Sequence, residues 1–135
     1  MDEELDRIRR EKMKGMLEKT EMERGMSSKI EVDGSNFQER VIERSKKVPV
    51  VLDFWAAWCA PCLMLGPLLE ELADKYDGKF VLAKVDVNEN QQLAQQYGIR
   101  AIPAVKMFKG GRVVDEFVGA MPEPLVRKWL DKNLG

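Results

Sequence analysis

The chain has 135 residues, of which 44% are hydrophobic, which is enough for one domain with a buried core. Its 22 Lys and Arg and 23 Asp and Glu leave a formal net charge of -1, so we expect no nucleic acid partner. No apolar run approaches the roughly 20 residues that a membrane-spanning helix needs. Residues 1–15 lack the apolar core of a secretory signal, so we expect neither membrane insertion nor export.

The chain contains two cysteines and no histidine, which narrows its chemistry. Disulfide-stapled secreted scaffolds normally have more cysteines. Catalytic Cys–His and Ser–His pairs are impossible without histidine. A tetrahedral zinc site needs about four ligands, so we expect no metal site within one chain. Metal bridging between the cysteines of two chains stays open, and it would appear as metal-dependent dimers.

Residues 1–28 form a highly charged stretch that differs from the rest of the sequence. Five apolar residues fall on about one half of a helical wheel: Leu5, Ile8, Met13, Met16 and Leu17. Gly25 and Ser27–Ser28 then indicate a helix end and a short linker. We expect a helical or disordered extension that is either merely solvated or a docking element for a partner.

From residue 29 onward the pattern alternates between strand and helix, in the order βαβαβαββα. A short strand at 29–32 precedes a helix that Asp33 or Ser35 caps and that carries Phe37, Val41 and Ile42. The later strands are expected at 48–55, 80–87, 104–108 and 113–118, and the later helices at 59–76, 89–97 and 122–134. Residues 48–55 are apolar on both faces, as in a central parallel strand, and Gly110–Gly111 predicts a hairpin.

The sequence Trp58-Cys59-Ala60-Pro61-Cys62 stands where this central strand gives way to a helix. Two cysteines three residues apart on a first helical turn bring their sulfurs close enough to bond. The unpaired N–H groups of a helix N-terminus favour a thiolate. We expect the first cysteine to be the more exposed nucleophile and the second to attack the mixed disulfide. Two unrelated buried cysteines are the alternative.

Beyond this motif, residues 30–134 resemble thioredoxins along their whole length. The similar stretches are DFWAAWCAPC (53–62), GPLLEELADKY (66–76), AKVDVNEN (83–90), QYGIRAIPAV (96–105) and FKGGRVVDEFVGA (108–120). The resemblance implies an α/β thioredoxin fold at 29–135, with a central mixed sheet flanked by helices. It also implies a protein-disulfide reductase that uses its own disulfide and no other cofactor. Because the export signal is lacking, we expect a cytoplasmic protein, and we expect a monomer. Its partners would be oxidised substrate proteins and a thioredoxin-reductase-like electron donor.

Asp53 stands inside the apolar central strand, where an unpaired carboxylate is costly to bury. By resemblance, it is the buried acid beneath the redox pair and moves protons for Cys62. An edge position that reaches solvent is the alternative. Lys84 matches the lysine near that acid, although a solvated strand lysine fits the sequence nearly as well.

The resemblance also implies a substrate-binding surface around the cysteines. Pro103 matches the family's cis-proline, next to which the backbone of Ile102 binds an extended substrate. Without the resemblance, Pro103 would be a plain strand-starting proline. Trp58 is expected to contact substrate, whereas Trp55 is expected to be largely core. The remaining members are Ala60, Pro61, Gly119 and Ala120, of which Gly119 is expected to permit close backbone approach.

Three features depart from the family pattern. Ala60–Pro61 stands where Gly-Pro is usual, Leu63 replaces a common lysine, and residues 1–28 have no family counterpart. Because the first departure bears on the reduction potential, an oxidant or isomerase is a second hypothesis. Ile102 before the proline and the lack of an export signal argue against it. A binding module whose extension docks a partner is a third hypothesis.

Overall fold

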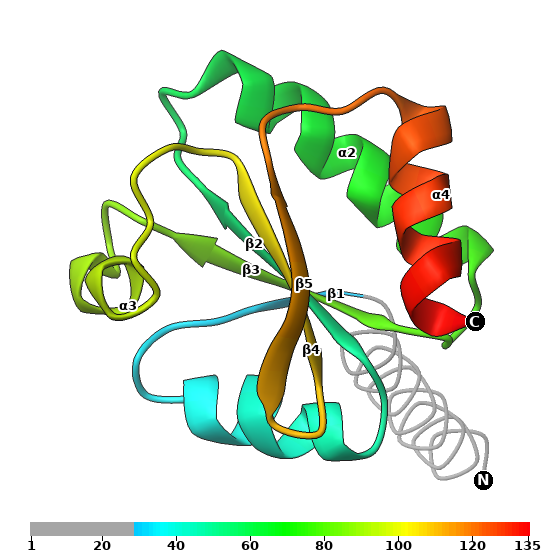
Figure 1. Cartoon of the computed structure of the whole chain (residues 1–135). Coiled ribbons are helices and arrows are strands. Elements are labelled where there is room, and N and C mark those ends of the chain that lie inside the picture. Colours follow the sequence, from blue (N-terminus) through cyan, green and yellow to red (C-terminus); the bar gives the residue numbers. More distant parts are fainter. Residues whose placement is uncertain (1–28) are drawn as a thin grey trace, which may run out of the picture.

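The computed structural model describes residues 29–135, so the expected extension at residues 1–28 lies outside the described part. A five-stranded sheet in the order β1-β3-β2-β4-β5 forms the centre of the molecule (Figure 1). Its strands are β1 (Lys29–Glu31), β2 (Val50–Trp55), β3 (Val81–Asp86), β4 (Ala104–Lys109) and β5 (Arg112–Val118). The α-helices are α2 (Ala60–Lys75), α3 (Gln91–Gln96) and α4 (Glu123–Leu134).

The sheet is mixed, as expected. Strands β1, β3 and β2 are parallel, whereas β4 is antiparallel to both β2 and β5. The order βαβαβαββα is confirmed. Gly110 and Gly111 join β4 to β5 with φ values of 63° and 86°. Two positive φ angles are what a tight two-residue hairpin of this kind requires, so glycine is needed at both positions.

The first helical segment differs from the expected α-helix. It consists of a π-helical turn, η1 (Gln38–Glu43), followed by a 3-10 turn, η2 (Arg44–Lys46). Asp33 stabilises the turn that leads into this segment, because its carboxylate accepts the N–H groups of Ser35 and Asn36 at 2.8 and 3.2 Å. At its end the buried Ser45 hydroxyl accepts the Gly111 N–H at 2.9 Å, which holds the β4–β5 turn against this segment.

Helices cover both faces of the sheet. One face packs against η1 and α3 through a cluster that includes Phe37, Leu52, Phe54 and Phe108. The other face packs against α2 and α4, with buried residues Val51, Leu65, Leu69, Leu72, Leu82, Val105, Met107, Val126, Trp129 and Leu130. Because side chains alternate along a strand, Asp53 shares the face of Val51 and so points toward α2 and α4.

The two helices on that second face lie side by side in Figure 1. Of the four leucines expected to face the sheet from α2, Leu65, Leu69 and Leu72 are buried and Leu68 is partly buried. Within residues 29–135, no helix has the length and apolarity to cross a membrane. Strand β2 ends at Trp55, shortly before the two cysteines, in a sheet that has helices packed on both faces.

Candidate active site

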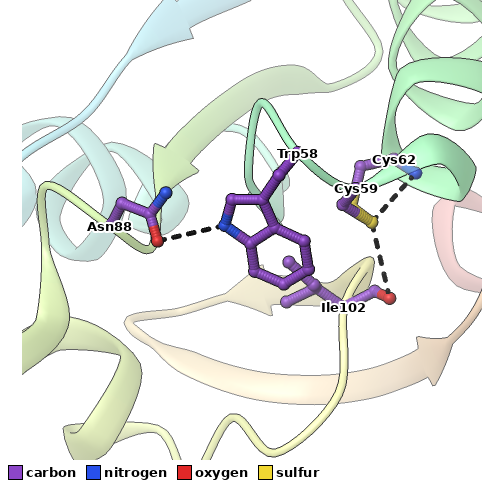
Figure 2. The surroundings of a disulfide bond; sticks show 5 residues. All are labelled: Trp58, Cys59, Cys62, Asn88 and Ile102. Atoms are coloured by element: carbon purple, nitrogen blue, oxygen red, sulfur yellow. Dashed lines mark hydrogen bonds between the residues drawn. A yellow bond between two sulfur atoms is a disulfide. The ribbon is translucent and has the colours of Figure 1, made fainter.

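Cys59 and Cys62 stand at the start of α2 and are joined as a disulfide, with their Cα atoms 5.3 Å apart. Cys59 is the N-cap residue, and its backbone is extended (φ -94°, ψ 103°). Its sulfur accepts the backbone N–H of Cys62 at 3.3 Å (Figure 2). Ala60 and Pro61 fill the first helical positions, where proline sacrifices no helical hydrogen bond. The first sulfur thus lies where the helix N-terminus presents its unpaired N–H groups.

In this disulfide form Cys59 is the more exposed of the two cysteines, as expected, but the difference is small. Cys59 is 5% exposed and Cys62 is 3% exposed, so both are buried. They pack in one cluster with Ala56, against which Trp55, Val87 and Ile102 are partly buried. The asymmetry between them lies in hydrogen bonding, because only Cys59 caps the helix with its sulfur.

The loop before β4 lies against the Cys59 sulfur. The Ile102–Pro103 peptide bond is cis, which confirms the expectation for Pro103. The Ile102 carbonyl oxygen lies 3.8 Å from the Cys59 sulfur, as Figure 2 shows. Pro103 is buried, and its carbonyl accepts the N–H of Gly119 at 2.8 Å. The structure therefore brings Ile102, Pro103 and Gly119 together beside the cysteines.

The backbone conformation at Gly119 requires a glycine. A Cβ atom at Gly119 would meet nothing within 4 Å, so no close approach within the described residues demands a glycine. Its φ of 97° does, because side-chain-bearing residues rarely adopt that conformation. Ala120 follows as an exposed residue.

Apolar side chains are exposed next to the cysteines. Trp58 is 69% exposed, and its indole N–H donates to the Asn88 side-chain oxygen at 3.3 Å (Figure 2). Leu63 and Met64, on the first turn of α2, are also exposed. Sulfurs joined at a helix start, a cis-proline loop and an apolar rim together form a site that can exchange disulfides with another protein.

Comparisons with known proteins agree with this geometry. The family model described as Thioredoxin matches residues 28–132. The chain belongs to the thioredoxin family. It is 52% identical over 111 residues to Thioredoxin 2 of Chlorobaculum tepidum, which covers 82% of this chain and 100% of that protein. It is 49% identical over 106 residues to Thioredoxin of Chlorobaculum thiosulfatiphilum (78% and 96%), and 46% identical over 109 residues to Thioredoxin 1 of a Nostoc species (81% and 100%).

The activity follows from this membership. The protein is a thiol–disulfide oxidoreductase of the thioredoxin type, and its redox motif is the pair Cys59–Cys62. Thioredoxins act on substrate proteins, are reduced by thioredoxin reductase, and use their own disulfide and no cofactor. Within residues 29–135, no three His, Cys, Asp or Glu side chains are grouped as in a metal site.

Asp53 is fully buried in the central strand of this thioredoxin, so the solvent-reaching alternative is wrong. Among the described residues, neither of its carboxylate oxygens has a hydrogen-bond partner. Burial raises the pKa of Asp53 to about 7, against an opposing effect of the Lys84 ammonium. A carboxyl that titrates near neutral pH can take up and release a proton under the conditions in which the protein works.

Lys84 lies opposite Asp53 in the β2–β3 register, but its ammonium is paired elsewhere. The Lys84 Nζ lies 3.3 Å from a carboxylate oxygen of Glu70 on α2, and 5.1 Å from the centroid of the Trp55 ring. The Lys84 side chain is only 16% exposed, so it is not the solvated strand lysine that the sequence left open. Trp55 is half-buried under the cysteine cluster.

Two residues of this site were missed in the sequence. Asn88 lies in the turn after β3, and Glu70 lies on the third turn of α2. A faint signal for Asn88 was its position after a parallel strand, because residues at the carboxyl ends of such strands lie near the site in such sheets. For Glu70 there was none, since its partner is 14 residues away on another element.

Proposed function

We propose that this thioredoxin works in the reducing direction, with Cys59 as the nucleophile and Cys62 as the resolving cysteine. The N-cap position of Cys59 carries the proposal. An anionic sulfur at that position accepts the Cys62 N–H and lies at the positive end of the α2 dipole. Cys62 lies inside the first turn of α2. Its N–H donates the hydrogen bond that stabilises the Cys59 sulfur, and its own sulfur does not cap the helix.

The reaction takes two exchange steps. The Cys59 thiolate attacks one sulfur of a substrate disulfide, which forms a mixed disulfide and releases the other substrate sulfur as a thiolate that takes a proton from water. The Cys62 thiol then loses its proton and attacks the Cys59 sulfur. This step forms the Cys59–Cys62 disulfide and releases the second substrate thiolate. Two electrons thus pass from the dithiol to the substrate.

Asp53 is proposed to receive the proton that Cys62 loses in the second step. Its carboxyl is buried on the sheet face that α2 covers, and its pKa of about 7 leaves much of it ionised at neutral pH. A base of this strength accepts a thiol proton and returns it when the disulfide is reduced again. Lys84 is proposed to moderate this exchange through its charge.

The substrate is proposed to lie across the apolar rim of the cysteines. In this proposal Trp58, Ala60 and Ala120, of which Trp58 is 69% exposed, contact the substrate, and the Ile102 backbone, which lies beside Cys59, pairs with it. Pro61, Pro103 and Gly119 hold the backbone of these segments. Leu63 adds an exposed apolar side chain where the family commonly has a lysine, which favours apolar over acidic substrate segments.

We further propose that residues 29–135 act as the complete reductase domain, in a monomer recycled by a thioredoxin reductase in the cytoplasm. The family model supports the boundary, since its match begins at residue 28 and ends at residue 132. An oxidant or isomerase of the same fold remains the competing function, because Ala60 alters the dipeptide between the cysteines.

Insulin reduction tests the proposed function. With dithiothreitol or a thioredoxin reductase as the electron source, the full chain should accelerate cleavage of the insulin disulfides catalytically. Residues 29–135 alone should retain the rate of the full chain within about twofold, because every proposed site residue lies in them. No acceleration with either electron source would contradict a reductase, and loss of activity on truncation would contradict the domain boundary.

A further inference from the structure

Within residues 29–135, Lys84 is the one positive charge that acts on Asp53, and three carboxyl groups lie around it: Asp53, Glu31 and Glu70. In the sheet register, Lys84 is the partner of Asp53 on one side and of Glu31 on the other. Glu70 approaches from α2. Among the described residues, the Lys84 ammonium forms an ion pair within 4 Å with Glu70. The position of this ammonium therefore decides how strongly the buried carboxylate is stabilised.

Local packing favours the position next to Glu70. The Lys84 Nζ passes α2 at Gly66, where a Cβ atom would stand 3.4 Å from it. Gly66 lies one helical turn before Glu70, so the missing side chain leaves the path to Glu70 open. The Trp55 ring lies 5.1 Å from the same ammonium and provides a further favourable contact. At 31% and 16% exposure, the Glu70 and Lys84 side chains form a partly buried pair and not a surface pair.

The other elements packed around Asp53 in the described part of the chain bring no competing charge. Val105 is its register partner on β4 and is buried. The buried residues of α4 on this face are apolar: Val126, Trp129 and Leu130. The charges that act on Asp53 are thus Lys84, which lowers its pKa, and Glu70 and Glu31, which raise it.

We propose that Glu70 is a positioning residue for the redox reaction. By pairing with the Lys84 ammonium on α2, it keeps that charge from closing onto the Asp53 carboxylate, so the carboxyl stays able to hold a proton near neutral pH. The inference rests on the proposed role of Asp53 as the proton acceptor for Cys62. Without Glu70, Lys84 pairs with Asp53, and the buried carboxyl becomes a weaker base that is ionised to a greater extent at neutral pH.

Glu70→Gln tests this in the full-length oxidised protein. The Asp53 titration is followed by the carboxyl carbon shift in NMR. Loss of Glu70 should lower the midpoint, which lies at about 7 in the unaltered protein, by about 1 pH unit. Glu71→Gln is the matched control, because Glu71 lies on the same helix but pairs with Lys75 at 2.9 Å. It removes the same charge and should leave the Asp53 midpoint unchanged.

The same substitution in a Lys84→Met protein distinguishes positioning of the Lys84 ammonium from direct charge repulsion between Glu70 and Asp53. In Lys84→Met, the Glu70→Gln change should shift the Asp53 midpoint less than half as far, because there is no ammonium left to reposition. An equal shift in both backgrounds, or no fall with Glu70→Gln, would overturn the inference.

The pH profile of insulin reduction distinguishes this inference from the proposed function. If Glu70 and Asp53 act as proposed, Glu70→Gln moves the profile to lower pH together with the Asp53 midpoint. A moved midpoint with an unmoved profile would support the placement of Lys84 by Glu70 and contradict the role of Asp53 as proton acceptor.

Discussion

Cys59→Ser should lower the rate of insulin reduction at least about 1,000-fold, to the uncatalysed background. A serine hydroxyl is not ionised at neutral pH, so the N-cap position can no longer present an anionic nucleophile to a substrate disulfide. The variant should fold normally, because the hydroxyl can still accept the Cys62 N–H. The measurement is the initial rate with dithiothreitol as the electron source.

Cys62→Ser should fail differently, because the first exchange step remains possible. The Cys59 thiolate should form a mixed disulfide with the substrate that no second thiol resolves. Non-reducing electrophoresis and mass spectrometry should show a covalent adduct that dithiothreitol removes. Adducts that form with Cys59→Ser and not with Cys62→Ser would reverse the two roles.

Asp53→Asn should stabilise the protein at pH 8 by up to about 4 kcal/mol relative to the original chain. The pKa of Asp53 is raised from 3.8 to about 7 in the folded state, chiefly by burial. Each pH unit of such a shift corresponds to about 1.4 kcal/mol. For a group with a raised pKa, the folded state has its full stability below the unfolded pKa and loses it as the pH rises through the folded pKa. The loss therefore falls between about pH 4 and pH 7, and the neutral amide avoids it.

The test is denaturant unfolding of both oxidised proteins at several pH values. The difference in the free energy of unfolding between them should grow from pH 4 to pH 8. A difference that stays constant would show that ionisation of Asp53 does not destabilise the folded state. Asp115→Asn is a control of opposite sign, because the Asn133 amide lowers the pKa of Asp115. For a lowered pKa, stability is lost as the pH falls, so this difference should change only below about pH 4 to 5.

The strands and helices were largely predictable, because the spacing of apolar residues and the turn and capping residues at the ends of each segment indicate the same elements. The apolar run at 48–55 indicated a central strand, and β2 is indeed flanked by β3 and β4. Paired glycines with positive φ fixed the β4–β5 hairpin. The first helical segment was wrong in type, because propensity does not separate α from π hydrogen bonding over a few residues.

The site was predictable only where chemistry and spacing coincide. The two cysteines were recognisable from their spacing at the start of a helix, whereas the prediction of a cis bond before Pro103 rested on the resemblance alone. The small exposed fraction of Cys59 was not predictable, because it depends on the loop at Ile102 and Pro103, which is 43 residues away and lies against the sulfur. The Glu70–Lys84 pair was not predictable for a similar reason, since it depends on how closely α2 crosses β3 at Gly66.

The reduction potential of the Cys59–Cys62 pair tests the central claim most directly. It is measured by equilibrating the full chain in graded dithiothreitol buffers and trapping the free thiols. A value near -270 mV, the one established for thioredoxin itself, is the expected result and fits a cytoplasmic reductant. A value between about -180 and -120 mV, as for disulfide isomerases and strong oxidants, would mean that Ala60 has reversed the working direction and would contradict the account.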